Sequence, residues 1–336
     1  MNPNQRLYEQ EVRHQIGLRR FSESTIRRSV ALIDRTIEDL TARLRQLELD
    51  GVTEGQALRN INSLLRSFRE QQAEFRQSLE TLIAEDLEGL ALSEARFNTR
   101  NISAAVGVGF NVPTEAASVA AANSRPFQGR FLREWISGLE TATAARIRDQ
   151  VRIGFLEGEG IDAIVRRIRG TRSRQFKDGI AEITRRDAQR IVRTAVSHTA
   201  NSSSQIIYEA ASDVISGVRY TAILDSRTSL ICSGLDGNVY PIDSGPRPPQ
   251  HPNCRSTTAA VVKGAPPFSR ETYSDWLNRQ PRSVQDEVLG PTRARLFREG
   301  LNIERFTDRR GQAWNLDELE RRESGLWMQA GLDDEE

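Results

Sequence analysis

Three residues in the C-terminal half of this 336-residue chain could hold a soft metal ion. His251 and Cys254 form an H-x-x-C pair, and Cys232 lies upstream of it. Zinc prefers thiolate sulfur and imidazole nitrogen and takes four ligands in a tetrahedron. Asp225 or a water molecule could supply the fourth ligand. Three protein ligands and one open position are typical of a catalytic zinc, whereas two reduced thiols and a hydrogen-bonded histidine need no metal. We favour the second interpretation.

The segment from Ile161 to Arg193 is rich in arginine. It carries ten positive and four negative side chains, although the net charge of the whole chain is only +1. Such a patch could contact DNA phosphates or an acidic partner, and a solvated helix face would explain it equally well. The candidate contact residues are Arg166, Arg167, Arg169, Arg172, Arg174, Arg185 and Arg186.

Other features argue against several classes of protein. Two cysteines are too few for a disulfide framework. The segment from Met1 to Arg13 is polar and charged, unlike a signal peptide, and no apolar run approaches the roughly 18 residues of a membrane helix. The sequence lacks H-E-x-x-H, G-x-S-x-G and Walker motifs. We therefore expect a protein made and kept in the cytoplasm, with no membrane partner and no small-molecule substrate.

Two long apolar stripes predict a helical arm in the N-terminal part of the chain. From Ser22 to Leu47, apolar residues alternate spacings of four and three, as in a coiled coil. A second stripe runs from Leu58 to Leu82, with Gln72 at one seam position. The seam residues are Ile26, Val30, Ile33, Ile37, Leu40, Leu44 and Leu47 in the first stripe, and Leu58, Ile61, Leu65, Phe68, Phe75, Leu79 and Leu82 in the second.

Capping signals predict where the two helices of this arm begin and end. Ser22 can cap the first helix and Asp50-Gly51 can end it. Thr53 and Gln56 form a capping box for the second helix, which we expect to reach about Ser93. So short a turn forces the helices to run antiparallel. The stripes could face the protein's own C-terminal module or another chain, and we favour another chain.

The rest of the chain alternates helices, turns and a few strands. Short helices are expected from Thr114 to Ala122 and from Ile161 to Ile168, and longer helical segments at 131–155 and 183–214. The expected strands are 218–224, 238–240 and 257–262. We therefore predict an α+β, predominantly α protein. Its predicted parts are a helical hairpin arm (1–97), a linker (98–128), a helical region (129–216), a small β-rich part with the cysteine and histidine motif (217–265), and short C-terminal helices with an acidic tail (266–336).

Several motifs occur in an order that resembles one known family. D-S-R at Asp225 to Arg227 is followed by Cys232, by L-D-G at Leu235 to Gly237, and by P-P-Q-H-P-N-C-R at Pro248 to Arg255. Over roughly residues 130–320 this order resembles the minor head proteins of the phage Mu F type. The resemblance implies structural roles for Asp225, Arg227, Asp236, Gly237, Pro249 and Arg255.

The chain departs from this family pattern at two positions. Ser229 and Ser256 stand where the family commonly has cysteines, so two potential metal ligands are absent. We therefore expect no tightly bound zinc and no other cofactor. If zinc binds, the expected ligands are Cys232, His251 and Cys254.

The resemblance implies a structural protein of a tailed-phage head rather than an enzyme. Such a protein would act in head morphogenesis at or near the portal vertex, and genome delivery is a further candidate role. The expected partners are the portal protein and other capsid components, with packaged DNA as a further candidate. The expected location is the virion, in the head interior or at the portal vertex, after synthesis in the host cytoplasm. The alternatives are a metal-dependent hydrolase and a DNA-binding protein ejected with the genome.

Overall fold

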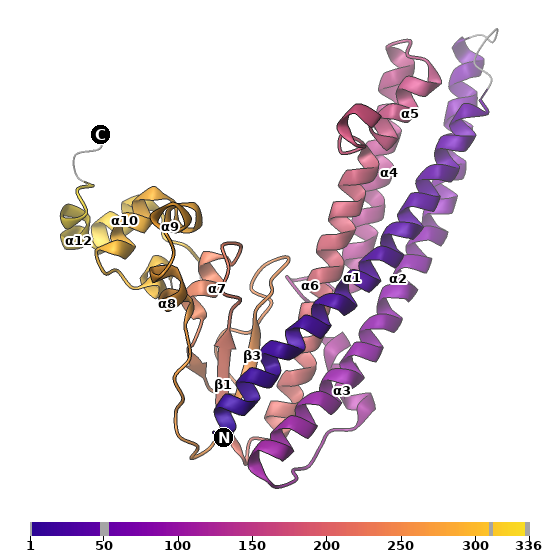
Figure 1. Cartoon of the computed structure of the whole chain (residues 1–336). Coiled ribbons are helices and arrows are strands. Elements are labelled where there is room, and N and C mark those ends of the chain that lie inside the picture. Colours follow the sequence, from indigo (N-terminus) through magenta and orange to yellow (C-terminus); the bar gives the residue numbers. More distant parts are fainter. Residues whose placement is uncertain (1, 48–53, 309–311, 333–336) are drawn as a thin grey trace. The chain divides into compact units, whose positions relative to one another are not determined.

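The computed structural model describes residues 2–47, 54–308 and 312–332 and confirms an α+β, predominantly α protein (Figure 1). Within these residues, no helix combines the length and apolar character needed to span a bilayer. The elements are α1 (Pro3–Arg45), α2 (Glu54–Val106), α3 (Glu115–Ser124), α4 (Leu132–Leu156), α5 (Ile161–Arg169), the 3₁₀ turn η1 (Arg172–Arg174), α6 (Ile180–Ala210), β1 (Ile215–Thr221), α7 (Leu230–Leu235), β2 (Val239–Tyr240), β3 (Thr257–Val262), α8 (Tyr273–Asn278), α9 (Arg282–Leu289), α10 (Pro291–Arg298), the 3₁₀ turn η2 (Ile303–Phe306), α11 (Leu316–Arg322) and α12 (Ser324–Gln329).

The chain forms two compact units, each built from segments that are distant in the sequence. The bundle unit contains Gly17–Leu90 and Asn123–Val196. The sheet unit contains Met1–Ile16, Ala91–Ala122 and Ser197–Glu336. The long helices α1, α2 and α6 therefore contribute residues to both units.

The predicted antiparallel hairpin is present, and α1 and α2 form it in the bundle unit. The Thr25 hydroxyl donates to Asp86 at 2.5 Å, and Arg43 donates to Ser67 at 3.2 Å. Thr25 precedes Arg43 on α1, whereas the partner of Thr25 follows the partner of Arg43 on α2, so the two helices run antiparallel. The predicted seam is largely correct: Ile33, Ile37, Phe68, Phe75 and also Gln72 are buried.

Three details of the predicted arm are wrong. Because α1 already begins at Pro3, Ser22 lies inside the helix and is not its N-cap. The second helix continues beyond Ser93 to Val106, because residues 94–106 contain no glycine or proline that would end it. Leu58 is 44% exposed instead of buried in the seam. The predicted helix stop at Asp50-Gly51 and the capping residue Thr53 lie outside the described residues.

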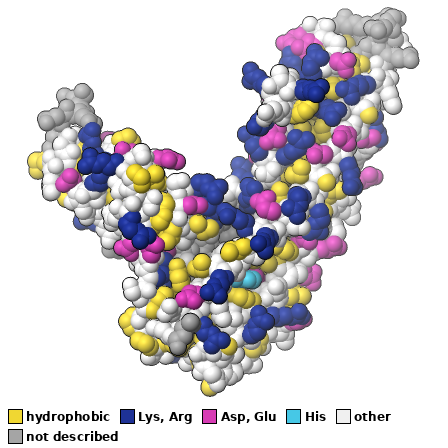
Figure 2. Space-filling view, in the orientation of Figure 1, with side chains coloured by type: hydrophobic (Ala, Val, Ile, Leu, Met, Phe, Trp, Pro, Cys, Tyr) yellow, Lys and Arg dark blue, Asp and Glu magenta, His cyan; other side chains and the backbone are white. Residues whose placement is uncertain are grey.

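The apolar stripes of the hairpin face the protein's own helices, which corrects the expectation that they face another chain. Within the bundle unit, α4 and α6 pack along α1 and α2 (Figure 1). Ion pairs connect Arg76 with Glu140 at 3.5 Å and Arg185 with Asp34 at 2.7 Å. Apolar side chains of α4 and α6 are fully buried, including Ile147, Val151 and Val192. Charged side chains cover the exposed faces of these helices (Figure 2).

A three-stranded antiparallel sheet in the order β2-β1-β3 forms the centre of the sheet unit. The central strand β1 begins at Ile215 and ends at Thr221, three residues earlier at each end than the predicted strand 218–224. It runs through Gly217, where a Cβ atom would lie 2.5 Å from the carbonyl oxygen of Tyr240. Glycine at this position therefore allows β2 to pair closely with β1. The third strand has the predicted bounds, 257–262.

Two apolar clusters stabilise the sheet unit. One cluster joins β1 and β3 to the N-terminal part of α1, the C-terminal part of α2 and the end of α6, through Leu7, Ile102, Ile207, Tyr208 and Val218. The other holds the short C-terminal helices together. Its most buried members are Tyr273, Leu277, Ala294, Leu296, Phe306 and Leu319.

Two buried acidic residues, Glu11 of α1 and Glu94 of α2, connect α1, α2 and β3 within the sheet unit. Glu11 accepts a hydrogen bond from the Thr257 hydroxyl at 2.7 Å, and His14 Nε2 lies 2.5 Å from a Glu94 oxygen. Burial, together with the nearby charge of Glu94, raises the pKa of Glu11 to about 7, although Thr257, His14 and Gln15 oppose the shift. This carboxyl group therefore remains partly protonated near neutral pH.

Replacing Ile37 with Asp tests the hairpin seam. Burial of such a side chain contributes about 1.5–3 kcal/mol, and a carboxylate there would add a desolvation cost. We expect Ile37→Asp to lower the melting temperature followed by circular dichroism. Leu58→Asp is the matched control, because Leu58 is exposed, and should melt like the wild type. Unchanged melting of Ile37→Asp would contradict the seam.

Replacing Glu11 with Gln tests the buried carboxyl group. Because its folded pKa is raised from 4.5 to about 7, its stabilising contribution is complete below pH 4.5 and is lost as the pH rises through 7. We expect the urea midpoint of the wild type to fall between pH 5 and pH 8, and to fall less in Glu11→Gln. Glu9→Gln, at a partly exposed carboxyl group on the same helix, is the control. Equal pH dependence of Glu11→Gln and wild type would contradict the shifted pKa.

Candidate functional site

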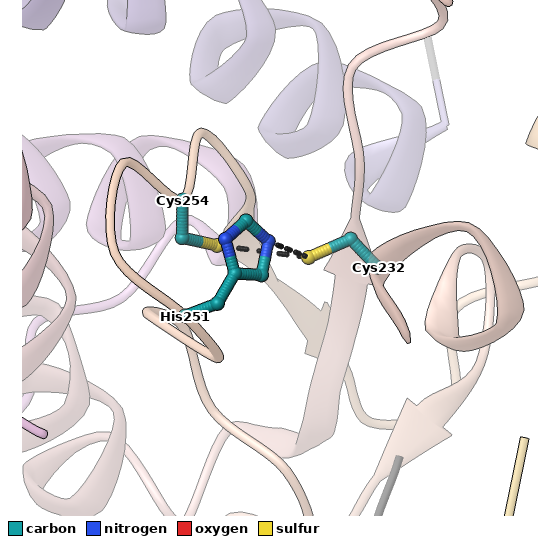
Figure 3. Close-up of side chains that lie close together, drawn as sticks. All are labelled: Cys232, His251 and Cys254. Carbon is teal, nitrogen blue, oxygen red and sulfur yellow. Dashed lines mark hydrogen bonds between the residues drawn. The ribbon is translucent and has the colours of Figure 1, made fainter. Parts of the chain in front are cut away.

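Cys232, His251 and Cys254 meet in the sheet unit, as Figure 3 shows. The Cys232 sulfur lies 3.3 Å from His251 Nε2 and 3.6 Å from the Cys254 sulfur. All three ligand atoms lie within 4.8 Å of one another. Both cysteines are buried and His251 is half-buried. The structure thus brings together the three residues that the sequence singled out.

The antiparallel sheet explains why residues so far apart in sequence meet. Thr221 at the end of β1 pairs with Thr257 at the start of β3. The chain leaving β1 enters α7, which carries Cys232 in its first turn, and the chain entering β3 has just passed Cys254. The Ser229 hydroxyl caps α7 by accepting from the Cys232 amide at 3.3 Å.

The spacing of the three ligand atoms fits a zinc-sized ion. With zinc bonds of about 2.3 Å to sulfur and about 2.0 Å to nitrogen, tetrahedral geometry gives sulfur–sulfur edges of about 3.8 Å and sulfur–nitrogen edges of about 3.5 Å. The two separations that involve Cys232, 3.6 Å to the Cys254 sulfur and 3.3 Å to His251 Nε2, are slightly shorter, and the Cys254 sulfur lies within 4.8 Å of the imidazole. Three corners of a tetrahedron could therefore be filled by small movements of these side chains.

The fourth position is not filled by Asp225, the candidate that the sequence offered. Asp225 instead accepts two hydrogen bonds from Arg255, both at 2.6 Å, and this pairing lowers its pKa to about 2. The Ser229 hydroxyl lies nearest, 2.8 Å from His251 Nε2. A neutral serine hydroxyl is a much weaker zinc ligand than a thiolate.

The protonation of the three residues suits a hydrogen-bonded cluster as well as a metal site. A hydrogen bond from Cys232 lowers the pKa of Cys254 to about 6, while the same contact and burial raise the pKa of Cys232 to about 12. The contact between the two sulfurs therefore favours a thiolate at Cys254 and a thiol at Cys232. His251 Nδ1 lies 2.9 Å from the Pro252 carbonyl oxygen, which can accept its proton and leave Nε2 directed at Ser229 and Cys232.

Asp236 joins the β-rich part to the C-terminal helices. Its fully buried carboxylate accepts from the Ala222 amide at 2.7 Å and from the Tyr273 amide at 2.9 Å. Arg270, almost fully buried, forms an ion pair with it at 2.8 Å. Sequence reasoning found Asp236 but missed Arg270, because nothing near Arg270 distinguishes it from the other arginines of the chain.

The other residues of the family-like motif lie around this centre. Gly237 follows Asp236 with a φ of 90°, in the left-handed region that favours glycine. Arg227 is mostly exposed, and its guanidinium is 3.5 Å from Asp225. Pro249 follows a cis peptide bond in the loop before His251.

The seven basic candidates all lie in the bundle unit, and three of them are neutralised within it. Arg167 pairs with Glu157 and Glu159, Arg185 with Asp34 and Glu182, and Arg186 with Glu182 at 3.9 Å. Within the described part of the chain, the other four form no ion pair. These are Arg166, Arg169, Arg172 and Arg174.

Two of these four lie on a closed loop between Gly170 and Gly179. Asp178 accepts from the amide and the hydroxyl of Thr171, both at 2.7 Å, and these bonds lower its pKa. A Cβ atom on Gly179 would lie 2.2 Å from the Gly170 nitrogen, so the two ends of the loop touch. The loop presents Arg172, Arg174 and Lys177 to solvent together with a partly exposed Phe176.

Comparison with known proteins supports the resemblance found in the sequence. The model of the family described as Phage Mu protein F like protein matches residues 145–259, about a third of the chain. The matched segment includes α5, α6, β1, β2, the first half of β3, and Cys232, His251 and Cys254. No curated protein and no solved structure matches the chain. The suspected Mu F-like family is thus confirmed over this segment.

Replacing Ser229 with Cys tests the ligand set. The new sulfur would lie near His251 Nε2 and Cys232, completing a set of three thiolates and one imidazole. We expect the wild type to hold little zinc after purification without chelator, and Ser229→Cys to hold about one equivalent. Elemental analysis measures both, and Ser233→Cys, in the same helix, is the control. One equivalent in the wild type, lost in Cys254→Ser, would contradict the expectation.

Proposed function

We propose that this Mu F-like chain is a structural protein of a tailed-phage head that acts in head morphogenesis. The family match at residues 145–259 is the observation that carries the proposal. In this proposal the chain catalyses no reaction. It works in the virion by docking on the portal protein at the vertex, so its function depends on an exposed surface and not on a catalytic pocket.

The end of α4 in the bundle unit offers a surface for this docking. Leu156 is 80% exposed, and Ile153 is 37% exposed. Residues three apart lie on the same helix face, so the two side chains form one apolar patch. An apolar helix face can fill a groove on a partner protein. The seam of the hairpin cannot serve, because the bundle unit itself covers it.

A metal-dependent hydrolase is the second candidate, and the meeting of Cys232, His251 and Cys254 supports it. A catalytic zinc needs an open position for water and substrate. Here the cysteines are 1% and 3% exposed, and the Ser229 hydroxyl contacts the imidazole nitrogen that would face the metal. This burial favours a structural role for the cluster.

Co-expression with the cognate portal protein tests the proposal. We expect a complex that survives size-exclusion chromatography and that Leu156→Asp weakens at least tenfold. Met328→Asp is the matched control, because Met328 is 62% exposed on α12, outside the proposed surface. The control variant should bind like the wild type.

Two outcomes would contradict different parts of this proposal. An undisturbed complex with Leu156→Asp would show that the portal docks elsewhere on the chain. Absence of any association with portal protein or procapsid, combined with hydrolysis of nucleic acid or peptide that His251→Ala abolishes, would replace the structural function with the hydrolase.

A further inference from the structure

Four arginines line one groove in the bundle unit, outside the basic segment that the sequence drew attention to. Arg59, Arg66 and Arg69 come from α2, and Arg152 comes from α4. The groove has a volume of about 780 Å³. Its remaining lining consists of Gln56, Asn60, Asn62, Ser63 and Leu65.

The positive charge of this groove is not neutralised within the described chain. None of the four arginines forms an ion pair or hydrogen bond with a described residue, and the described lining of the groove contains no acidic side chain. In the same unit, Arg76, Arg167 and Arg185 all have carboxylate partners. The groove therefore concentrates guanidinium groups that are available to an external anion.

The spacing of the arginines suits an extended polyanion. Steps of seven and three residues place Arg59, Arg66 and Arg69 on one face of α2, spread over about 15 Å of helix axis. One strand of B-DNA carries a phosphate about every 3.4 Å along its axis. Several phosphates of a single strand could therefore face this row, with Arg152 approaching from the other wall.

The neutral residues of the groove distinguish between possible anions. Side-chain amides and hydroxyls of Asn, Gln and Ser commonly contact phosphate and sugar in DNA complexes. A protein partner would need an apolar centre, and among the described lining residues only Leu65, itself buried, is apolar. Single strands are usually held by bases stacked on aromatic rings, and none of the residues described in the lining is aromatic.

From these features we infer that the groove between α2 and α4 binds the phosphate backbone of duplex DNA without reading its sequence. Guanidinium groups hold the phosphates, and the amide and hydroxyl groups bind phosphate and sugar oxygens. This inference does not depend on portal docking, which involves Leu156 and Ile153. It adds a binding site that lies mostly before the Mu F-like segment, since only Arg152 falls within residues 145–259.

The test measures binding of the full-length protein to a fluorescent 20-base-pair duplex by anisotropy, between 50 and 200 mM salt. Each lost phosphate contact lowers the slope of log affinity against log salt by about 0.9. We expect Arg66→Gln with Arg152→Gln to lower the slope by about 2 and to weaken binding at least tenfold. Arg27→Gln with Arg35→Gln changes the charge equally, at exposed α1 positions outside the groove, and should leave the slope within half a unit.

Three results would overturn the inference. The first is an equal slope and affinity in the groove variant and the wild type, with circular dichroism showing both folded. The second is equal affinity for the single strand of the same sequence, which would remove the preference for duplex. The third is binding of polyglutamate that the groove variant weakens while the duplex fails to bind, which would assign the groove to an acidic protein. Loss of duplex binding with an intact portal complex would support the inference independently of the proposed function.

Discussion

The buried carboxylate of Asp236 fixes the part of the sheet unit that carries the cysteines and the histidine. It is bound by the Ala222 amide just after β1, by the Tyr273 amide at the start of α8 and by the Arg270 guanidinium. A buried carboxylate that loses such partners destabilises a protein by about 3–5 kcal/mol. The folded chain therefore keeps the end of β1, α7 and the C-terminal helices together, and the position of Cys232 follows from that constraint.

The same constraint shows why the cluster of thiols and imidazole can keep its geometry without metal. Cys232 is fixed from the side of α7, whose capping residue Ser229 also contacts His251. Cys254 is fixed from the side of β3, which pairs with β1 along its whole length. Two serines in place of expected ligands then leave a site whose shape is maintained by hydrogen bonds and strand pairing. The hydrogen bond between the two sulfurs, which lie 3.6 Å apart, also connects the two sides of the site.

Sequence periodicity predicted the elements better than it predicted their partners. The heptads gave the hairpin and most of its seam, since a long apolar stripe must be covered. They could not show that α4 and α6 provide the cover, because a stripe does not identify what packs on it. Likewise, residue types and spacing found Cys232, His251 and Cys254. They left Asp225 open as a candidate fourth ligand, because its partner Arg255 becomes visible only when the loop before β3 folds back.

The sequence likewise does not show which charged side chains pair after folding, and two places in the bundle unit illustrate this in opposite ways. The basic segment from Ile161 to Arg193 looks strongly positive in sequence, yet carboxylates from several helices neutralise part of it. Around Arg59 and Arg152 the local sequence shows no charge run, yet folding gathers four unneutralised guanidinium groups in one groove. Electrostatic attraction depends on the charges that remain unpaired after folding. An anion-binding surface on this chain is therefore better located from its ion pairs than from its runs of arginine.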